Sequence, residues 1–548
     1  MESPQEQFQS TPTSLPPTLQ ATIQTETTVG LGRRIGFLVG YIFTFVVAYA
    51  VIANVLVIGT LIVYFILWEN LPSGAFGIEK VAAFIVAIFL AWITGKYFHW
   101  QVFKRVVKPH PAHGRILRVS FFALYSMFIL AFVLVITPSV LGLFFRDIAT
   151  TDDTDLQLPT LSIQDNQNAL TDLTTAGEAL DKTYDTEKLR AILSGKTWDA
   201  AFAAQAIASN TPALSLYATA ASKSVFQDPV PAKPDTLSPA SILPTLSPWR
   251  TLDRFNGVSA LYLAHQGKSA EALQTVLVGV NVGHKIETSQ GHLIEWLVGY
   301  AIKIQALETI QRIIASSSIT TKDLKSVAES LRTYTDDRSG LIKAMKVEYY
   351  SMKNQIDMIA HGDTQDAGGT GNLIMLSSSI DRTSFYFHPN QSISYLADER
   401  KDDIKNIQSG CNVIKQKEIT KLAPTNLALL YFTPNAIGII LHDIVAVSLG
   451  NNLNTKVCQE NTLLNATRLL AAIKAYKQDN KGKLPTSLDE LVPTYLSDMP
   501  LDPFTGQAFK YDPAKQIIYS IGQNKKDVGG SVGDSWNQME NPTFSVAF

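Results

Sequence analysis

Three apolar segments between residues 35 and 145 constrain the fold of this chain more than any other feature of its sequence. The first segment, 35–68, contains no charged residue, the second covers 81–99, and the third covers 119–145. A helix of about 20 apolar residues is long enough to cross a bilayer. The sequence therefore predicts three membrane-spanning helices, with buried helices of a large soluble protein as the alternative.

The distribution of basic residues predicts how these helices would be oriented. The connection 96–118, between the second and third segments, contains lysine and arginine but no acidic residue. Connections of this kind stay in the cytoplasm, and Arg33 and Arg34 place the N-terminus there as well. We therefore expect a multi-pass protein of the inner (cytoplasmic) membrane, with the bilayer as a partner and an extracytoplasmic region after Phe145.

The overall composition limits the classes of partner and the possible disulfides. The net charge of −2 gives no support to nucleic-acid binding. Residues 1–30 are rich in Gln, Thr, Pro and Ser, which is typical of a disordered tail. Cys411 and Cys458 are the two cysteines of the chain, and they form either a disulfide or two buried free thiols.

Helical patterns dominate from residue 149 onward. A loop with six prolines at 228–248 separates a first group of helices from a second one. The segment "LYLAHQGKSAEALQ" resembles one unit of a tetratricopeptide-type (TPR-like) hairpin with Gly267 at its turn, but no second copy follows, so we expect an irregular helical bundle. The expected helices are 165–181, 186–193, 198–209, 258–266, 269–282, 291–316, 321–334, 339–361 and 390–417.

Two His-x-x-Glu units, His284/Glu287 and His292/Glu295, form a candidate metal site in this region. A glycine directly before each unit argues against one continuous helix. Di-metal bundles also use the reverse order, Glu-x-x-His, on separate helices. The better interpretation is that these residues are polar helix ends, with Glu295 buried and paired.

The C-terminal part has the pattern of one long helix that packs on a small sheet. An apolar stripe over 463–476 predicts a helix that ends near Asn480. Ser487 and Glu490 form a capping box for a short helix. The segments 508–511 and 516–521 then predict an antiparallel hairpin.

The words "KLPTSLDELVPTYLSDMPLDPFTGQAFKYD" and "QIIYSIGQNKKDVGG" carry a family resemblance. Over residues 463–530 the chain resembles the C-terminal domain of major pseudopilins of type II secretion systems. The whole arrangement resembles uncharacterised bacterial membrane-anchored envelope proteins with that domain. A pseudopilin has a glutamate where this chain has Tyr41, so we do not expect processing into a fibre subunit. The resemblance also implies a calcium site at Asp527 and Asp534, the alternative being a glycine-rich tail held by its own backbone.

These observations predict a mostly α protein with three transmembrane helices, an α-helical ectodomain (irregular bundle, TPR-like hairpin) and a small α+β pseudopilin-like C-terminal module. No catalytic motif was found, so we expect a scaffold, receptor or assembly factor that acts through protein partners or self-association. The alternatives are an enzyme with an unrecognised active site in the helical ectodomain and a subunit of a transport complex. The expected regions are a tail at 1–30, the transmembrane region at 31–148, a linker with helices and the proline-rich loop at 149–248, an α-helical domain at 249–432 and the pseudopilin-like module at 433–548.

Overall fold

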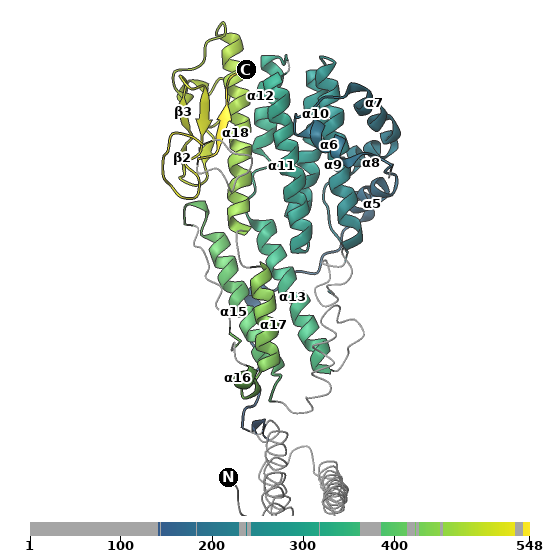
Figure 1. Cartoon of the computed structure of the whole chain (residues 1–548), viewed down its shortest axis with the longest axis vertical. Coiled ribbons are helices and arrows are strands. Elements are labelled where there is room, and N and C mark those ends of the chain that lie inside the picture. Colours follow the sequence, from purple (N-terminus) through teal and green to yellow (C-terminus); the bar gives the residue numbers. More distant parts are fainter. Residues whose placement is uncertain are drawn as a thin grey trace, which may run out of the picture. The chain divides into compact units, whose positions relative to one another are not determined.

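The computed structural model describes one unit, Leu141–Phe548, almost completely. The unit is mostly helical and has a small amount of sheet (Figure 1). The described residues are 137, 141–142, 144–181, 183–229, 237, 243–316, 318–361, 385–413, 422–423, 427–449, 453–531 and 541–548.

None of the helices in these ranges has both the length and the apolar character needed to cross a membrane. Helix α11, Leu293–Ser316, is long but contains two glutamates, a lysine and an arginine, whereas α17, Ala436–Leu449, is apolar but has 14 residues. This finding contradicts the prediction of three transmembrane helices, of an integral multi-pass protein of the inner membrane and of an extracytoplasmic C-terminal region. The first two apolar segments, 35–68 and 81–99, lie outside the described residues. Only a few residues near the end of the third segment, 119–145, are described.

The upper part of the unit in Figure 1 is a helical bundle that ends in the C-terminal module. The four short helices α5–α8 pack against the long helix α9. Helices α10, α11 and α12 follow, and α18 lies between them and the strands of the module. The helices are α5 Leu170–Glu178, α6 Thr186–Leu193, α7 Ala200–Ser209, α8 Thr211–Ser222, α9 Leu243–His265, α10 Ser269–Thr288, α11, α12 Thr321–Arg332 and α18 Leu453–Asp479.

Several of these bounds differ from the prediction for local reasons. Helix α9 begins inside the predicted proline-rich loop and contains Pro248, whose ring packs on Gly177, where a side chain would leave no room for it. Helix α8 was not predicted, although Pro212 lies in its first turn, where proline is tolerated. Helix α10 continues through Gly283 to Thr288.

Gly283 stays helical because α10 and α11 approach each other closely at this point. A Cβ atom on Gly283 would lie 2.8 Å from the carbonyl oxygen of Gly299, and one on Gly299 would lie 2.7 Å from that of Gly283. Only glycine permits two helix backbones to pack at such a distance. The glycine that suggested a helix break in the sequence is therefore the point where two helices cross.

The lower part of the unit consists of α13, Ser339–His361, α15, Pro389–Gln408, α16, Leu427–Tyr431, and α17 (Figure 1). Its buried core includes Trp296, Met345, Tyr349 and Leu396. Helix α15 ends at Gln408, before Gly410 with its positive φ of 83°, rather than at residue 417 as predicted.

The C-terminal module contains two small antiparallel sheets. The predicted capping box of Ser487 and Glu490 is present, and it begins the short 3-10 helix η8, Leu488–Leu491. The predicted hairpin is present as β3 and β4, and β5 extends that sheet. The strands are β1 Leu501–Asp502, β2 Gln507–Ala508, β3 Lys510–Asp512, β4 Ile517–Tyr519 and β5 Thr543–Ser545.

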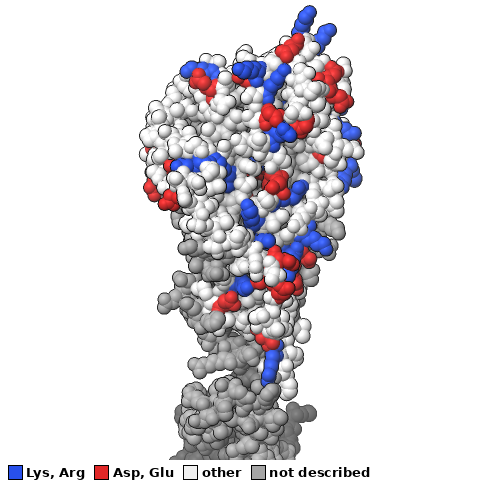
Figure 2. Space-filling view, turned by 180° about the vertical axis from the view of Figure 1, so that it is seen from behind, with Lys and Arg blue, Asp and Glu red and all other residues white. Residues whose placement is uncertain are grey.

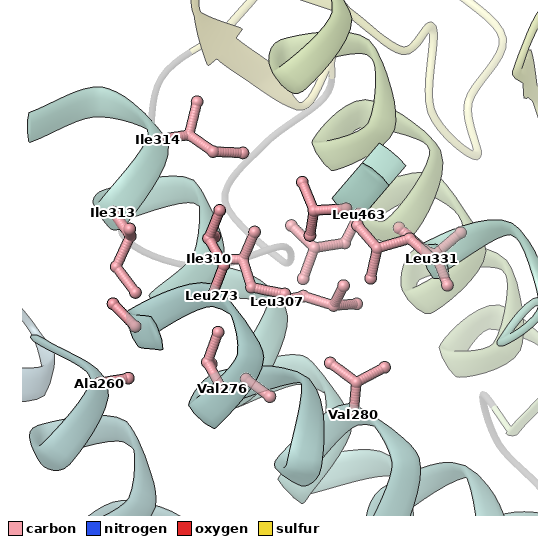
Figure 3. Close-up of a cluster of buried hydrophobic side chains, with 14 of the residues drawn as sticks. Ala260, Leu273, Val276, Val280, Leu307, Ile310, Ile313, Ile314, Leu331 and Leu463 are labelled. Atoms are coloured by element: carbon pink, nitrogen blue, oxygen red, sulfur yellow. The ribbon is translucent and has the colours of Figure 1, made fainter. Parts of the chain in front are cut away.

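One apolar core joins the bundle to the module. Val276 and Val280 from α10 and Leu463 from α18 belong to the same cluster (Figure 3). Ile518 and Val546 from the small sheet extend the same core on the other side of α18. Most charged side chains lie on the surface, and on the face in Figure 2 acidic and basic residues alternate without a large patch of one sign.

Asp253 on α9 is an exception, because its carboxyl group is buried in this core. The side chain is 3% exposed, and Oδ1 lies 3.4 Å from the hydroxyl of Tyr217. Gly279 leaves the necessary room, since a Cβ there would lie 2.2 Å from Oδ1. Burial raises the pKa of Asp253 to about 7.

We expect the substitution Asp253→Asn to stabilise the fold above pH 7. In the folded state Asp253 keeps its proton up to about pH 7, whereas in the unfolded state it loses the proton near pH 4. The free energy of unfolding therefore falls as the pH rises from about 4 to 7. The free energy of unfolding should rise by about 2 kcal/mol. This is less than the roughly 4 kcal/mol that corresponds to the pKa shift of Asp253, because the asparagine amide must also be buried. Urea unfolding of the wild type and of Asp253→Asn from pH 4 to 8 tests this prediction. If the free energy of unfolding depends on pH in the same way for both proteins, the prediction is wrong.

Candidate functional site

A buried lysine, Lys303, is the centre of the most unusual polar site in the described residues. It lies on α11, one turn after Gly299, where α10 and α11 cross. Its side chain is completely buried between α10, α11 and α18. A buried ammonium is stable only when carboxylates or other acceptors surround it.

Two glutamates from different helices contact this ammonium. The Lys303 Nζ donates to Oε2 of Glu287, on α10, at 3.0 Å. It also forms an ion pair with Oε1 of Glu460, on α18. Glu287 and Glu460 are 1% and 0% exposed, so water does not screen either pair.

A third carboxylate, Asp336, reaches the site from the connection between α12 and α13. Carboxylate oxygens of Glu287, Asp336 and Glu460 lie within 4.8 Å of one another. Asn461, the neighbour of Glu460, fixes this connection, because its Oδ1 accepts from the Asp336 N–H at 3.0 Å and its Nδ2 donates to the Asp336 carbonyl at 2.9 Å. The Oδ1 of Asp336 accepts from the backbone N–H of Arg338 at 2.7 Å.

The electrostatics of the site follow from burial and proximity. Burial, together with the adjacent Glu460, raises the pKa of Glu287 well above its usual range. The same two causes raise the pKa of Asp336 to about 6. Burial alone would lower the pKa of Lys303, but Glu287 and Glu460 outweigh it and the pKa is raised. The lysine is therefore charged at neutral pH.

The three carboxylates are close enough to share one cation. In the structure the ammonium of Lys303 forms ion pairs with two of them, Glu287 and Glu460. The arrangement ties α10 and α11 to α18 through a single charged group. Leaving such a group without its partner costs several kcal/mol in a protein interior. The site therefore holds α10, α11 and α18 together.

The two His-x-x-Glu units predicted from the sequence do not form a common site. Glu287 belongs to the lysine site, whereas Oε2 of Glu295 accepts from the His292 N–H at 3.2 Å, at the start of α11. Burial and the neighbouring Asp228 raise the pKa of Glu295 to about 8. His284 packs against Tyr334, and burial and Lys303 lower its pKa to about 4. The interpretation as polar helix ends, with Glu295 buried and paired, agrees with this geometry.

Cys411 and Cys458 form a disulfide, one of the two alternatives that the sequence left open. The bond joins the short 3-10 helix η7, Cys411–Val413, to α18, two residues before Glu460. Arg338 lies beside it, with Nη2 at 2.9 Å from Sγ of Cys411. The disulfide and the lysine site therefore hold the same end of α18.

The calcium site implied by the pseudopilin resemblance stays a prediction. Oδ1 of Asp527 accepts from the Tyr519 hydroxyl at 3.1 Å and from the Gly529 N–H at 3.0 Å. Lys510 lies 3.9 Å from its other oxygen. Asp534 lies outside the described residues.

A second buried polar set lies between α15 and α17. Nη1 of Arg400 donates to Asp403 at 2.6 Å, and its Nη2 lies 3.7 Å from Glu399. His442 lies 3.2 Å from Glu399 and 3.2 Å from Asp443. A hydrogen bond to Glu399, with a second to Asp443, raises the pKa of His442. These contacts fix α17 to α15.

The sequence analysis missed Lys303, Asp336 and Glu460. A signal was present for two of them, because Lys303 interrupts an apolar helix and Glu460 continues the stripe that begins at Leu463, one turn away. A charged residue at a core position of a helical stripe indicates a buried ion pair. Asp336 had no such signal, since it lies in a connection.

Comparison with known proteins adds no relative to this description. No protein-family model matches the chain, and no curated protein or solved structure matches it either.

Proposed function

We propose that residues 141–548 act as a rigid, non-enzymatic support that presents the C-terminal α+β module to protein partners, as a scaffold, receptor or assembly factor. One observation carries this proposal: α18 belongs both to the core of the helical bundle and to the module. Of its 27 residues, 19 are buried. A helix buried on all sides is a central element and not a mobile arm.

Polar contacts along α18 support the same conclusion. The Nε of Arg468 donates to the Ala328 carbonyl at 3.2 Å, and its Nη2 donates to Asp498 at 2.8 Å, so one side chain links α12, α18 and the module. Lys474 donates to the carbonyl of Ile314. Each of these bonds resists rotation of the module against the bundle.

The location of the perturbed acids and bases supports a non-catalytic role. A catalytic group must be reachable by its substrate, and functional sites collect shifted pKa values in clefts. Asp253, Glu287, Glu295 and Lys303, whose pKa values are strongly shifted, are all at most 3% exposed. Their shifts come from packing between helices, which is what a support requires.

The outer surface of the module offers apolar side chains to a partner. Leu501 is 46% exposed and Val528 is 50% exposed. The resemblance of residues 463–530 to the C-terminal domain of major pseudopilins, which belong to secretion systems, also supports a role in assembly.

Site-specific photocrosslinking of the full chain in living cells tests this proposal. A photoreactive amino acid replaces Leu501 or Val528 on the module, and Glu178, exposed on α5, serves as the matched control position. We expect discrete crosslinked products at the module positions, to another protein or to a second copy, and none at Glu178. Equal background at all three positions would contradict the proposal.

A further inference from the structure

The lysine site contains more negative than positive groups. Glu287, Asp336 and Glu460 surround one ammonium, so full ionisation would leave an excess of two negative charges in the interior. All four side chains are at most 3% exposed. Burying uncompensated charge is so unfavourable that a buried carboxyl group takes up a proton instead.

The unpartnered oxygens of the site locate such a proton. One carboxylate oxygen of Glu287 and one of Glu460 lie within 4.8 Å of each other in the interior. Without that proton, Oε1 of Glu287 and Oε2 of Glu460 have no donor among the described residues. A proton held between the two groups satisfies both oxygens and leaves one negative charge opposite Lys303.

We propose that the Glu287–Glu460 pair is a proton-binding site whose proton helps to attach α18 to α10 and α11. When the proton is lost, two carboxylates share one ammonium and repel each other. Glu287 is fixed in α10, close to the crossing with α11, so the end of α18 that carries Glu460 and the disulfide is the element that loosens. Because α18 also carries the module, the attachment of the module becomes dependent on pH.

The other charged and titratable groups around the pair do not produce the same response. Lys303 stays charged, and His284, with a pKa of about 4, stays neutral above pH 5. Asp336 loses its proton near pH 6, before the pair does. The groups that face the pair are His284 from α10, Tyr300 and Lys303 from α11, and Asp336, Asp337 and Arg338 from the α12–α13 connection.

The direction of the effect follows from linkage. A carboxyl group with a raised pKa in the folded state favours folding at low pH, and this contribution is lost as the pH rises through the folded pKa. Protection of α18 against hydrogen exchange should therefore fall above neutral pH. The ionisation of Asp336 adds a separate decrease in protection near pH 6. The variant Asp336→Asn should lack this decrease.

Hydrogen exchange of the full chain, measured by mass spectrometry from pH 6.5 to 9 and corrected for the intrinsic rate, tests the proposal. We expect protection of peptides from residues 453–468 to fall by up to tenfold for each pH unit over which the proton is lost, whereas α5–α8 change little. Glu460→Gln keeps the shape but cannot ionise, so its protection should be independent of pH. Glu329→Gln, an exposed change on α12, should retain the wild-type response.

A second measurement keeps the test decisive if a variant folds poorly. The infrared carbonyl band of protonated carboxyl groups should be present in the wild-type chain at neutral pH and weaker in Glu287→Gln or Glu460→Gln. An unchanged band, or an equal loss of protection in Glu460→Gln and wild type, would overturn the proposal. So would recovery of protection at pH 9 on addition of Ca²⁺ or Mn²⁺, because a metal ion would then neutralise the site. None of these readouts involves a partner, so their failure is distinct from failure of the proposed function.

Discussion

Replacing Lys303 with methionine should destabilise the folded chain by about 3–5 kcal/mol near pH 7. Methionine fills a similar volume, but it removes the ammonium that forms ion pairs with both Glu287 and Glu460. The two carboxyl groups then remain buried without compensation, and at least one must take up a further proton. Urea unfolding, followed through the fluorescence of buried Trp249 and Trp296, measures the loss.

The matched controls separate charge from packing. Lys322→Met, on the exposed side of α12, should change stability by less than about 0.5 kcal/mol. The triple variant Lys303→Met/Glu287→Gln/Glu460→Gln should recover most of the lost stability, because neutral groups of the same shape need no counter-charge. If the single and the triple variant are equally unstable, the lysine acts through packing and not through charge.

Removal of the disulfide should have the second large effect. The Cys411–Cys458 bond closes a loop with a sequence separation of 47, for which the chain-entropy relation gives about 4 kcal/mol. The double variant Cys411→Ser/Cys458→Ser should lose about this much stability in urea unfolding. The loss should appear as earlier unfolding of the end of α18 that also carries Glu460 and Asn461.

Reduction provides an independent check of this prediction. Wild-type chain treated with dithiothreitol should become as unstable as the double variant, and the same reagent should leave the double variant unchanged. A loss below about 1 kcal/mol would show that Asn461 and the lysine site fix this end of α18 without help from the disulfide.

Local features of the fold could be predicted from the sequence, because residues near one another determine them. The capping box of Ser487 and Glu490 and the hairpin that became β3 and β4 depend on a few adjacent residues. Helix α6 has the predicted bounds, because Asp185 caps it locally. These elements need no information from the rest of the chain.

The candidate site could not be predicted in the same way, since it depends on contacts between distant segments. The crossing of α10 and α11 occurs at Gly283 and Gly299, and in the sequence Gly283 suggested a helix break, whereas Gly299 lay unremarked inside a predicted helix. Only this crossing brings Glu287 next to Lys303, and only the packing of α18 adds Glu460. The charged residues inside α11 show how a long and largely apolar helix can be built into a protein core.

Helix α18 should unite the helical bundle and the C-terminal module in one cooperative unit. Pulsed hydrogen exchange along a urea titration of the full chain tests this prediction. The peptides of α10, α11, α18 and β3–β5 should lose protection at the same urea concentration, because they share one core. Loss of protection in β3–β5 and α18 at a clearly lower concentration than in α10 and α11 would contradict the prediction.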